Sequence, residues 1–179
     1  MANVVEMKKA RLEIASKRAF RNWKSKFRED FDGATRLSHL SDETLTFLAQ
    51  GKADSSFYLY DLIMNLQDLG SGFELNDLNP EEKISVIDRQ LFLLDRIRFE
   101  YMKRLGWLES YPGEEYSLSE LVISFDKLGP VCQTRHPDLA MDHPDYQTYG
   151  NMIDPFEREE FIRKLIVKAI EEIKYHSST

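Results

Sequence analysis

Hydrophobic residues recur at helical spacing from the start of the chain. Between residues 4 and 31, apolar side chains follow one another at steps of three, four and seven positions: Val5, Leu12, Ala19, Phe20, Trp23, Phe27 and Phe31. At 100° per residue, these positions fall within an arc of about 120°. The pattern predicts one long amphipathic helix over about 4–31, with Gly33 as its stop.

Two shorter helices are predicted next. Ser41 is a favourable N-cap for a helix that ends before Gly51. A further helix is expected over about 56–69, with Gly70 as its C-terminal glycine.

The strongest helix signal follows Asn79, which can cap a helix that has Pro80 at its first position and Gly106 after its last. This helix carries two apolar stripes. The first contains Ile84, Ile87, Leu91, Leu94, Tyr101 and Leu105, and the second contains Val86, Leu93 and Ile97. A helix that is apolar on two sides is usually central to a core. Long helices of this kind also tend to bury one stripe against a partner, which favours a homo-oligomer.

The last third of the chain is predicted to hold two more helices. Tyr111-Pro112-Gly113-Glu114 has the residues of a type II turn, and Ser117 with Glu120 forms a capping box in front of a helix that Gly129-Pro130 ends. Residues 130–153 have no helical period and are expected to be irregular. Asp154-Pro155 then begins the final helix, whose stripe contains Ile162, Leu165, Ile166, Ala169, Ile170 and Ile173.

No segment has the short alternation of a sheet strand. We therefore predict an all-α fold, a single domain over 1–179 built as a bundle of about six helices with one long irregular loop, about 130–153. Apolar residues make up 42% and charged residues 31% of the chain, which is typical of a soluble globular protein.

Charge changes this picture, because it is distributed unevenly. Residues 1–28 carry nine Lys or Arg and two acids, a net charge of +7. Because the whole chain has a net charge of −7, the remaining residues have a net charge of −14. The N-terminal helix is therefore predicted either to pack on its own acidic body or to project from it towards an anionic partner.

Six basic residues lie opposite the apolar stripe of that helix, within an arc of about 140°. An arrangement of this kind can follow a phosphate backbone or an anionic surface. The candidate residues for nucleic-acid or anion binding, within 8–28, are Arg11, Lys17, Arg18, Arg21, Lys24 and Arg28. The alternative is an ordinary solvated helix face.

A second candidate site lies in the predicted loop, where His-Pro-Asp occurs twice over residues 132–145. Thiolate, imidazole and carboxylate groups are available there as ligands for a divalent metal. These residues are Cys132, His136, Asp138, Asp142, His143 and Asp145. Because the prolines also suit ordinary turns, the spacing leaves a structural role for both histidines open.

Composition bounds the remaining possibilities. No stretch longer than eight residues lacks a charge, so no transmembrane segment is expected, and a single cysteine indicates a reducing, cytoplasmic location. The leading hypothesis is an intracellular helical protein-interaction or regulatory module without its own catalysis or cofactor, whose partner is a second copy (a homodimer) or another protein. The alternatives are nucleic-acid or anionic-surface binding through 8–28, and a metal-dependent enzyme that uses 132–145.

Overall fold

The computed structural model describes residues 2–177 and confirms the all-α prediction. The α-helices are α1 (Ala2–Ala19), α2 (Arg21–Phe27), α3 (Asp42–Ala49), α4 (Ala53–Leu66), α5 (Pro80–Arg104), α6 (Leu118–Ile123), α7 (Phe125–Gln133), α8 (Tyr146–Gly150) and α9 (Pro155–Ser177). Two 3-10 helices, η1 (Leu37–His39) and η2 (Gly72–Asp77), and two short strands, β1 (Leu108–Ser110) and β2 (Asp138–Leu139), complete this part of the chain.

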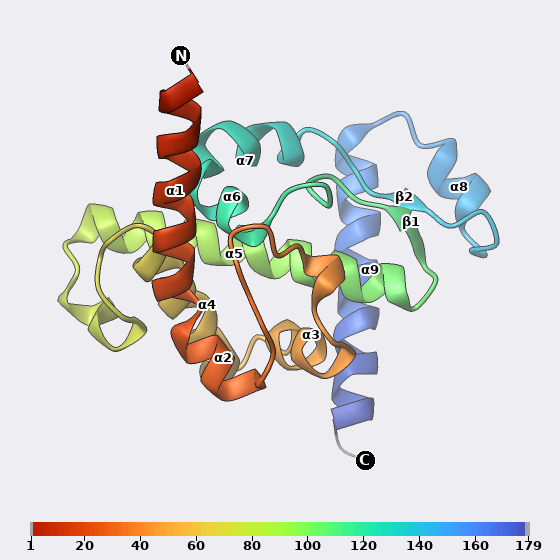
Figure 1. Ribbon diagram of the computed structural model, residues 1–179. Helices are drawn as coiled ribbons and strands as arrows, with labels where there is room; N and C mark the ends of the chain where they lie inside the picture. Colours follow the sequence, from red (N-terminus) through yellow and green to blue (C-terminus); the bar gives the residue numbers. More distant parts are fainter. Residues whose placement is uncertain (1, 178–179) are drawn as a thin grey trace.

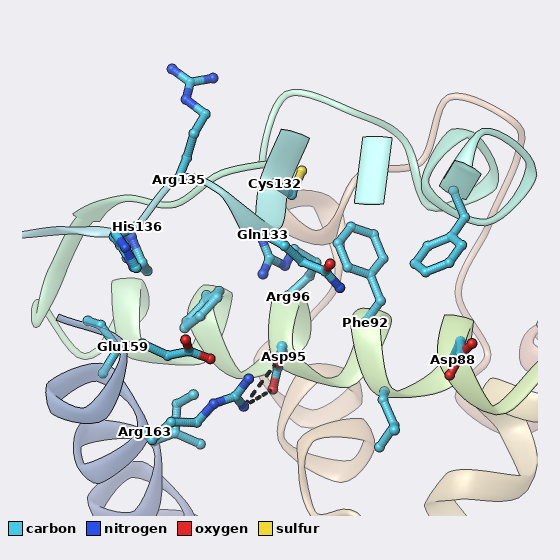
Figure 2. A pocket seen from close by; sticks show the side chains of 16 residues that line it. Asp88, Phe92, Asp95, Arg96, Cys132, Gln133, Arg135, His136, Glu159 and Arg163 are labelled. Carbon is cyan, nitrogen blue, oxygen red and sulfur yellow. Dashed lines mark hydrogen bonds and ion pairs between the residues drawn. The ribbon is translucent and has the colours of Figure 1, made fainter. Parts of the chain in front are cut away.

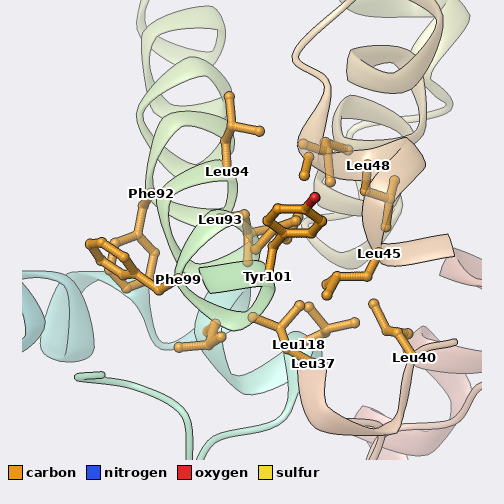
Figure 3. Close-up of a cluster of buried hydrophobic side chains, with 14 of the residues drawn as sticks. Leu37, Leu40, Leu45, Leu48, Phe92, Leu93, Leu94, Phe99, Tyr101 and Leu118 are labelled. Carbon is orange, nitrogen blue, oxygen red and sulfur yellow. The ribbon is translucent and has the colours of Figure 1, made fainter. Parts of the chain in front are cut away.

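The long helix α5 is the centre of the molecule. It contacts α3, α4, α6 and α9, and Figure 1 shows it running across the fold between the N-terminal helices and α9. Leucines from η1 and α3 meet the middle of α5 in the core cluster of Figure 3. The predicted position of this helix at the core is therefore confirmed.

Only one of the two stripes of α5 is fully buried. Val86, Leu93 and Ile97 are 0% exposed, whereas Ile84 is 60% and Leu91 is 55% exposed. The first stripe is covered only towards its C-terminal half, where Leu94 and Tyr101 are buried. Part of the predicted core stripe thus lies on the surface.

The N-terminal segment is shorter and more bent than predicted. Phe20 separates α1 from α2, although Phe20 N–H still donates to Ser16 O and Lys24 N–H to Phe20 O. The second helix ends at Phe27, because Arg28 adopts a left-handed conformation with φ 57°. The predicted end at 31 was wrong. Gly33 is not the C-terminal glycine of this helix. Its lack of a side chain lets the backbone pass close to Glu13, because a Cβ at this position would lie 3.0 Å from Glu13 Oε1.

The predicted N-cap residues are confirmed. Ser41, Asn79 and Ser117 each accept a hydrogen bond from the backbone three residues on, and Asp154 accepts one from Phe156 N–H. The end of α4 differs from the prediction. Leu69 N–H donates to Met64 O across a left-handed Asp68, so an aspartate and not Gly70 closes that helix.

The region after residue 118 departs most from the prediction. Ser124 divides the predicted helix into α6 and α7, and α7 continues through Pro130 to Gln133. Gly129 does not stop the helix. It leaves room for the Phe125 ring, which a Cβ at Gly129 would meet at 3.0 Å. Residues 130–153 were predicted to be irregular, but they include the end of α7, then β2 and α8.

The small sheet was not predicted. β1 pairs antiparallel with β2, with Leu108 opposite Leu139 and Ser110 opposite Asp138. Strands of two or three residues carry too little alternation to be recognised in a sequence. Their pairing is set by contacts that join distant segments.

None of the helices described within residues 2–177 combines the length and the apolar character that a bilayer span requires.

Candidate functional site

The exposed face of α5 combines apolar and acidic side chains. Glu81, Ile84, Asp88 and Leu91, which we call the α5 outer row, follow one another at steps of three and four residues. At 100° per residue they lie within an arc of about 80°. All four are exposed. Along the row, two carboxylates alternate with two large apolar side chains.

The first helix presents a row of opposite charge. Val4, Met7, Arg11 and Ile14, which we call the α1 outer row, also lie within an arc of about 80°. Val4 is 56%, Met7 55% and Ile14 69% exposed. The buried side of the same helix is elsewhere, because Ser16 and Ala19 face α4 and α6. Figure 1 shows the start of α1 reaching beyond α4.

The six predicted anion-binding residues do not form one free strip. Arg18 donates to Asn65 O at 2.8 Å and pairs with Asp68 at 3.3 Å, so it fastens α1 to the end of α4. Arg11, Lys17, Arg21 and Arg28 are exposed, and Lys24 is half-buried. The bend at Phe20 also places Arg11, Lys17 and Arg18 on α1 and Arg21 and Lys24 on α2, and Arg28 lies just beyond the end of α2.

A pocket of about 660 Å³ lies where α5, α7 and α9 meet. Phe92, Arg96 and Phe99 of α5 form its inner wall, and Cys132 and His136 lie on the opposite side. Figure 2 shows Glu159 and Arg163 of α9 at its edge, with Arg163 held to Asp95 by two contacts of 3.2 Å. Two of the predicted metal-ligating residues, Cys132 and His136, therefore line one cavity.

Arg96 is the most unusual residue of this pocket. It is 5% exposed, and its guanidinium lies 4.9 Å from the Phe92 ring centre and 4.8 Å from that of Phe99. Nη1 donates to Pro112 O at 2.6 Å. Burial lowers the pKa of Arg96 from its ordinary value, although arginine remains charged at neutral pH. A buried cation is thus held between two aromatic rings.

The predicted turn over 111–114 positions this arginine. Gly113 has φ 96°, and Glu114 N–H donates to Tyr111 O. A Cβ on Gly113 would lie 3.2 Å from Cys132 Sγ and 3.4 Å from Arg96 Cδ. Glycine therefore serves both the turn and the close approach of α7. The turn was predicted, but its role beside Arg96 was not.

The predicted metal ligands are not gathered into one centre. Cys132 is buried, and burial raises the pKa of its thiol against a smaller opposing effect of Arg96. Asp138 accepts from Ser110 Oγ in the small sheet, Asp142 is exposed, and His143 Nδ1 accepts from Asp145 N–H within a turn. Among the described residues, no group of three His, Cys, Asp or Glu could hold a metal ion. The histidines at 136 and 143 thus serve different local structures.

Two buried tyrosines near the pocket make the stability of the fold depend on pH in the alkaline range. Tyr111 donates to Glu100 Oε2 at 2.8 Å, and burial with this carboxylate raises its pKa well above the ordinary value. Tyr149 donates to Pro137 O at 2.6 Å, and burial raises its pKa to about 12. Both phenols stay protonated in the fold at a pH where the unfolded chain releases them.

We therefore expect the free energy of unfolding to fall as the pH rises above about 10, the ordinary pKa of tyrosine. In urea titrations across this range, Tyr149→Phe should show a shallower fall than the parent protein. The exposed Tyr175→Phe should follow the parent. Equal pH slopes for both variants would contradict this assignment.

Arg96 was not among the site residues predicted from the sequence. The available signal was the spacing of Phe92, Arg96 and Phe99, which places an aromatic ring four residues before and three residues after the arginine on one helix face. Such a spacing does not by itself show that α7 will bury the arginine.

Comparison with known proteins adds no assignment: no family model matches the chain, and no curated protein or solved structure is significantly similar to it.

Proposed function

We propose that the protein is a protein-interaction module that associates with a second copy of itself, the α1 outer row of each copy lying on the α5 outer row of the other. The observation that carries the proposal is the match between these two rows. Each offers large apolar side chains that are more than half exposed, and the α1 outer row carries one basic residue whereas the α5 outer row carries two acidic residues.

Spacing supports this pairing. Val4 to Ile14 and Glu81 to Leu91 both extend over ten residue steps, or about 15 Å of helix. The α1 row has three apolar residues, with Arg11 before the last of them, and the α5 row alternates Ile84 and Leu91 with Glu81 and Asp88. Helix faces with this alternation can bury their apolar side chains while opposite charges meet at the edges.

Charge disfavours the other symmetric arrangement, in which two α1 helices pair with each other. Lys8, Lys9 and Arg11 of one copy would then lie beside the same residues of the next. The N-terminal 28 residues carry +7 and the remainder −14, so contact between α1 and the acidic body is electrostatically favoured. A closed dimer uses that contact twice.

Sedimentation velocity over a dilution series tests the proposal. Ile84→Gln removes one apolar contact at each of two symmetric sites. With about 1 kcal/mol for each, the dissociation constant should rise by roughly 30-fold. Ile153→Gln is the matched control, because Ile153 is 95% exposed and lies outside both rows. A monomer at all concentrations would overturn the proposal.

A charge exchange tests the pairing itself. Arg11→Glu and Asp88→Lys should each weaken the dimer, and the double variant should restore it, because the opposite charges are then exchanged across the same contact. Failure of the double variant to recover would show that these rows do not meet. Binding of the monomer to anionic vesicles or to DNA, without a dimer, would favour the anionic-surface alternative instead.

A further inference from the structure

We infer that the pocket between α5, α7 and α9 binds a small organic molecule through its carboxylate, which the free edge of the Arg96 guanidinium would receive. The pocket shares Asp88 and Leu91 with the α5 outer row. The inference does not rest on the proposed self-association, because the experiment below reports on Arg96 and not on the mass of the protein.

Arg96 has unused hydrogen-bonding capacity. In the part of the chain that the structure describes, its Nε is buried without a partner, and of its three nitrogens only Nη1 makes a hydrogen bond, to Pro112 O. Within the described residues Arg96 has no ion pair, because the nearby Asp95 is held by Arg163. Leaving a buried donor unpaired costs about 1–3 kcal/mol. A ligand oxygen would remove that cost.

The edge that remains free has the geometry of a carboxylate site. Since Nη1 points to Pro112 O, Nε and Nη2 form the edge of the guanidinium that makes no hydrogen bond, and two parallel N–H groups of this kind match the two oxygens of a carboxylate. Nε itself is buried from solvent, so a carboxylate reaches this edge when the segment that covers it opens locally. Phe92 and Phe99 stack against the guanidinium from α5. The side chain is therefore held in one orientation before any ligand arrives.

The size and lining of the pocket suit a small molecule. Its volume of about 660 Å³ lies within the usual range of ligand sites. Ile162 and Ile166 of α9 and Phe125 of α7 supply apolar surface around the arginine. In Figure 2 Arg96 rises from α5 towards Cys132 and Gln133, whereas the Arg135 side chain is directed away from the pocket. A ligand would therefore meet Arg96 beside apolar side chains, in a pocket that charged side chains of α5 and α9 also line.

The neighbouring acids select the charge of the ligand. Asp88 and Glu159 also line the pocket, and Figure 2 shows the Glu159 carboxylate directed towards the Asp95–Arg163 pair. Two carboxylates at the edge oppose a doubly charged phosphate more than a singly charged carboxylate. A planar monoanion with an apolar body fits both the arginine and its surroundings.

NMR titration of the full chain with sodium benzoate, and separately with inorganic phosphate, tests the inference. The Arg96 Nε–H signal should shift and saturate with benzoate and respond more weakly to phosphate. Arg96→Lys keeps the charge but loses the paired donors, so benzoate affinity should fall at least about tenfold. A stronger response to phosphate would overturn the carboxylate assignment.

A second variant keeps the test independent of folding, since Arg96 is buried and its replacement can unfold the protein. Glu159→Gln removes a negative charge from the pocket edge and should tighten benzoate binding about twofold. Glu160→Gln is the matched control on the same helix, because Glu160 is 70% exposed and pairs with Lys164. An unmoved Nε–H signal, or weaker binding in Glu159→Gln, would refute the site.

Discussion

Replacing Trp23 with alanine is expected to lower the free energy of unfolding by about 3–5 kcal/mol. Trp23 is fully buried, and its ring centre lies 5.3 Å from that of Phe20, 5.6 Å from Phe27 and 5.5 Å from Phe31. Its indole N–H also donates to Tyr58 O at 2.9 Å. The substitution removes a large side chain from an aromatic cluster and the partner of a carbonyl on α4.

Urea unfolding followed by far-ultraviolet circular dichroism measures this effect without relying on tryptophan fluorescence. Trp23→Phe is the control, because it keeps an aromatic ring in the cluster and loses the indole hydrogen bond and part of the apolar volume. It should retain the larger part of the stability. An alanine variant as stable as the phenylalanine variant would show that this cluster does not hold α2 on α4.

Asp61→Ala is expected to cost about 2–4 kcal/mol, because it orphans donors from two other elements. The Asp61 carboxylate is 0% exposed and accepts from Asn22 Nδ2 at 2.9 Å and from Gly72 N–H at 2.8 Å. Asn65 Nδ2 is a third, longer contact at 3.3 Å. One carboxylate on α4 therefore joins α2 to η2 through hydrogen bonds alone.

The control for Asp61 is Asp77→Ala, which removes an exposed carboxylate from the same region. It should leave the urea midpoint within the small range usual for surface substitutions. Asp61→Asn should fall between the two, since its amide keeps one acceptor and turns one donor towards another donor. If Asp61→Ala and Asp77→Ala behave alike, the buried carboxylate does not stabilise the fold.

Features that depend on a few neighbouring residues were predicted correctly, whereas features that depend on tertiary packing were not. Asn79 was predicted as an N-cap from its immediate neighbours, and its side chain accepts from Glu82 N–H. The reciprocal bond from Asn79 N–H to Glu82 was not predicted. The bend at Phe20 could not be predicted in this way. Phe20, Trp23 and Phe31 converge on one cluster only when α4 is in place, so tertiary packing decides where the helix bends and ends.

The same limit explains the error on α5 and the omission of Arg96. Ile84 and Val86 are equally apolar in sequence, and only the positions of the neighbouring helices decide that Val86 is buried and Ile84 is exposed. Cys132 and His136 were predicted as site residues from their ligand chemistry, and both line the pocket. The arginine opposite them becomes unusual only through burial, a property that no local pattern carries.

The pairing of β1 with β2 has a consequence for how the Arg96 pocket is reached. Ala140 N–H donates to Trp107 O at 3.0 Å beside the strands, so the segment between 110 and 138 leaves and returns at one point. Within it, α6 is anchored by the Ser16–Ser119 hydrogen bond and by Leu118 N–H on Thr35 O. The part from α7 to 137 is thus tethered at both ends, and the entropy of closing that loop is already lost. Solvent and solutes can then reach Arg96 through local opening of this tethered segment, at a lower free energy than unfolding of the bundle.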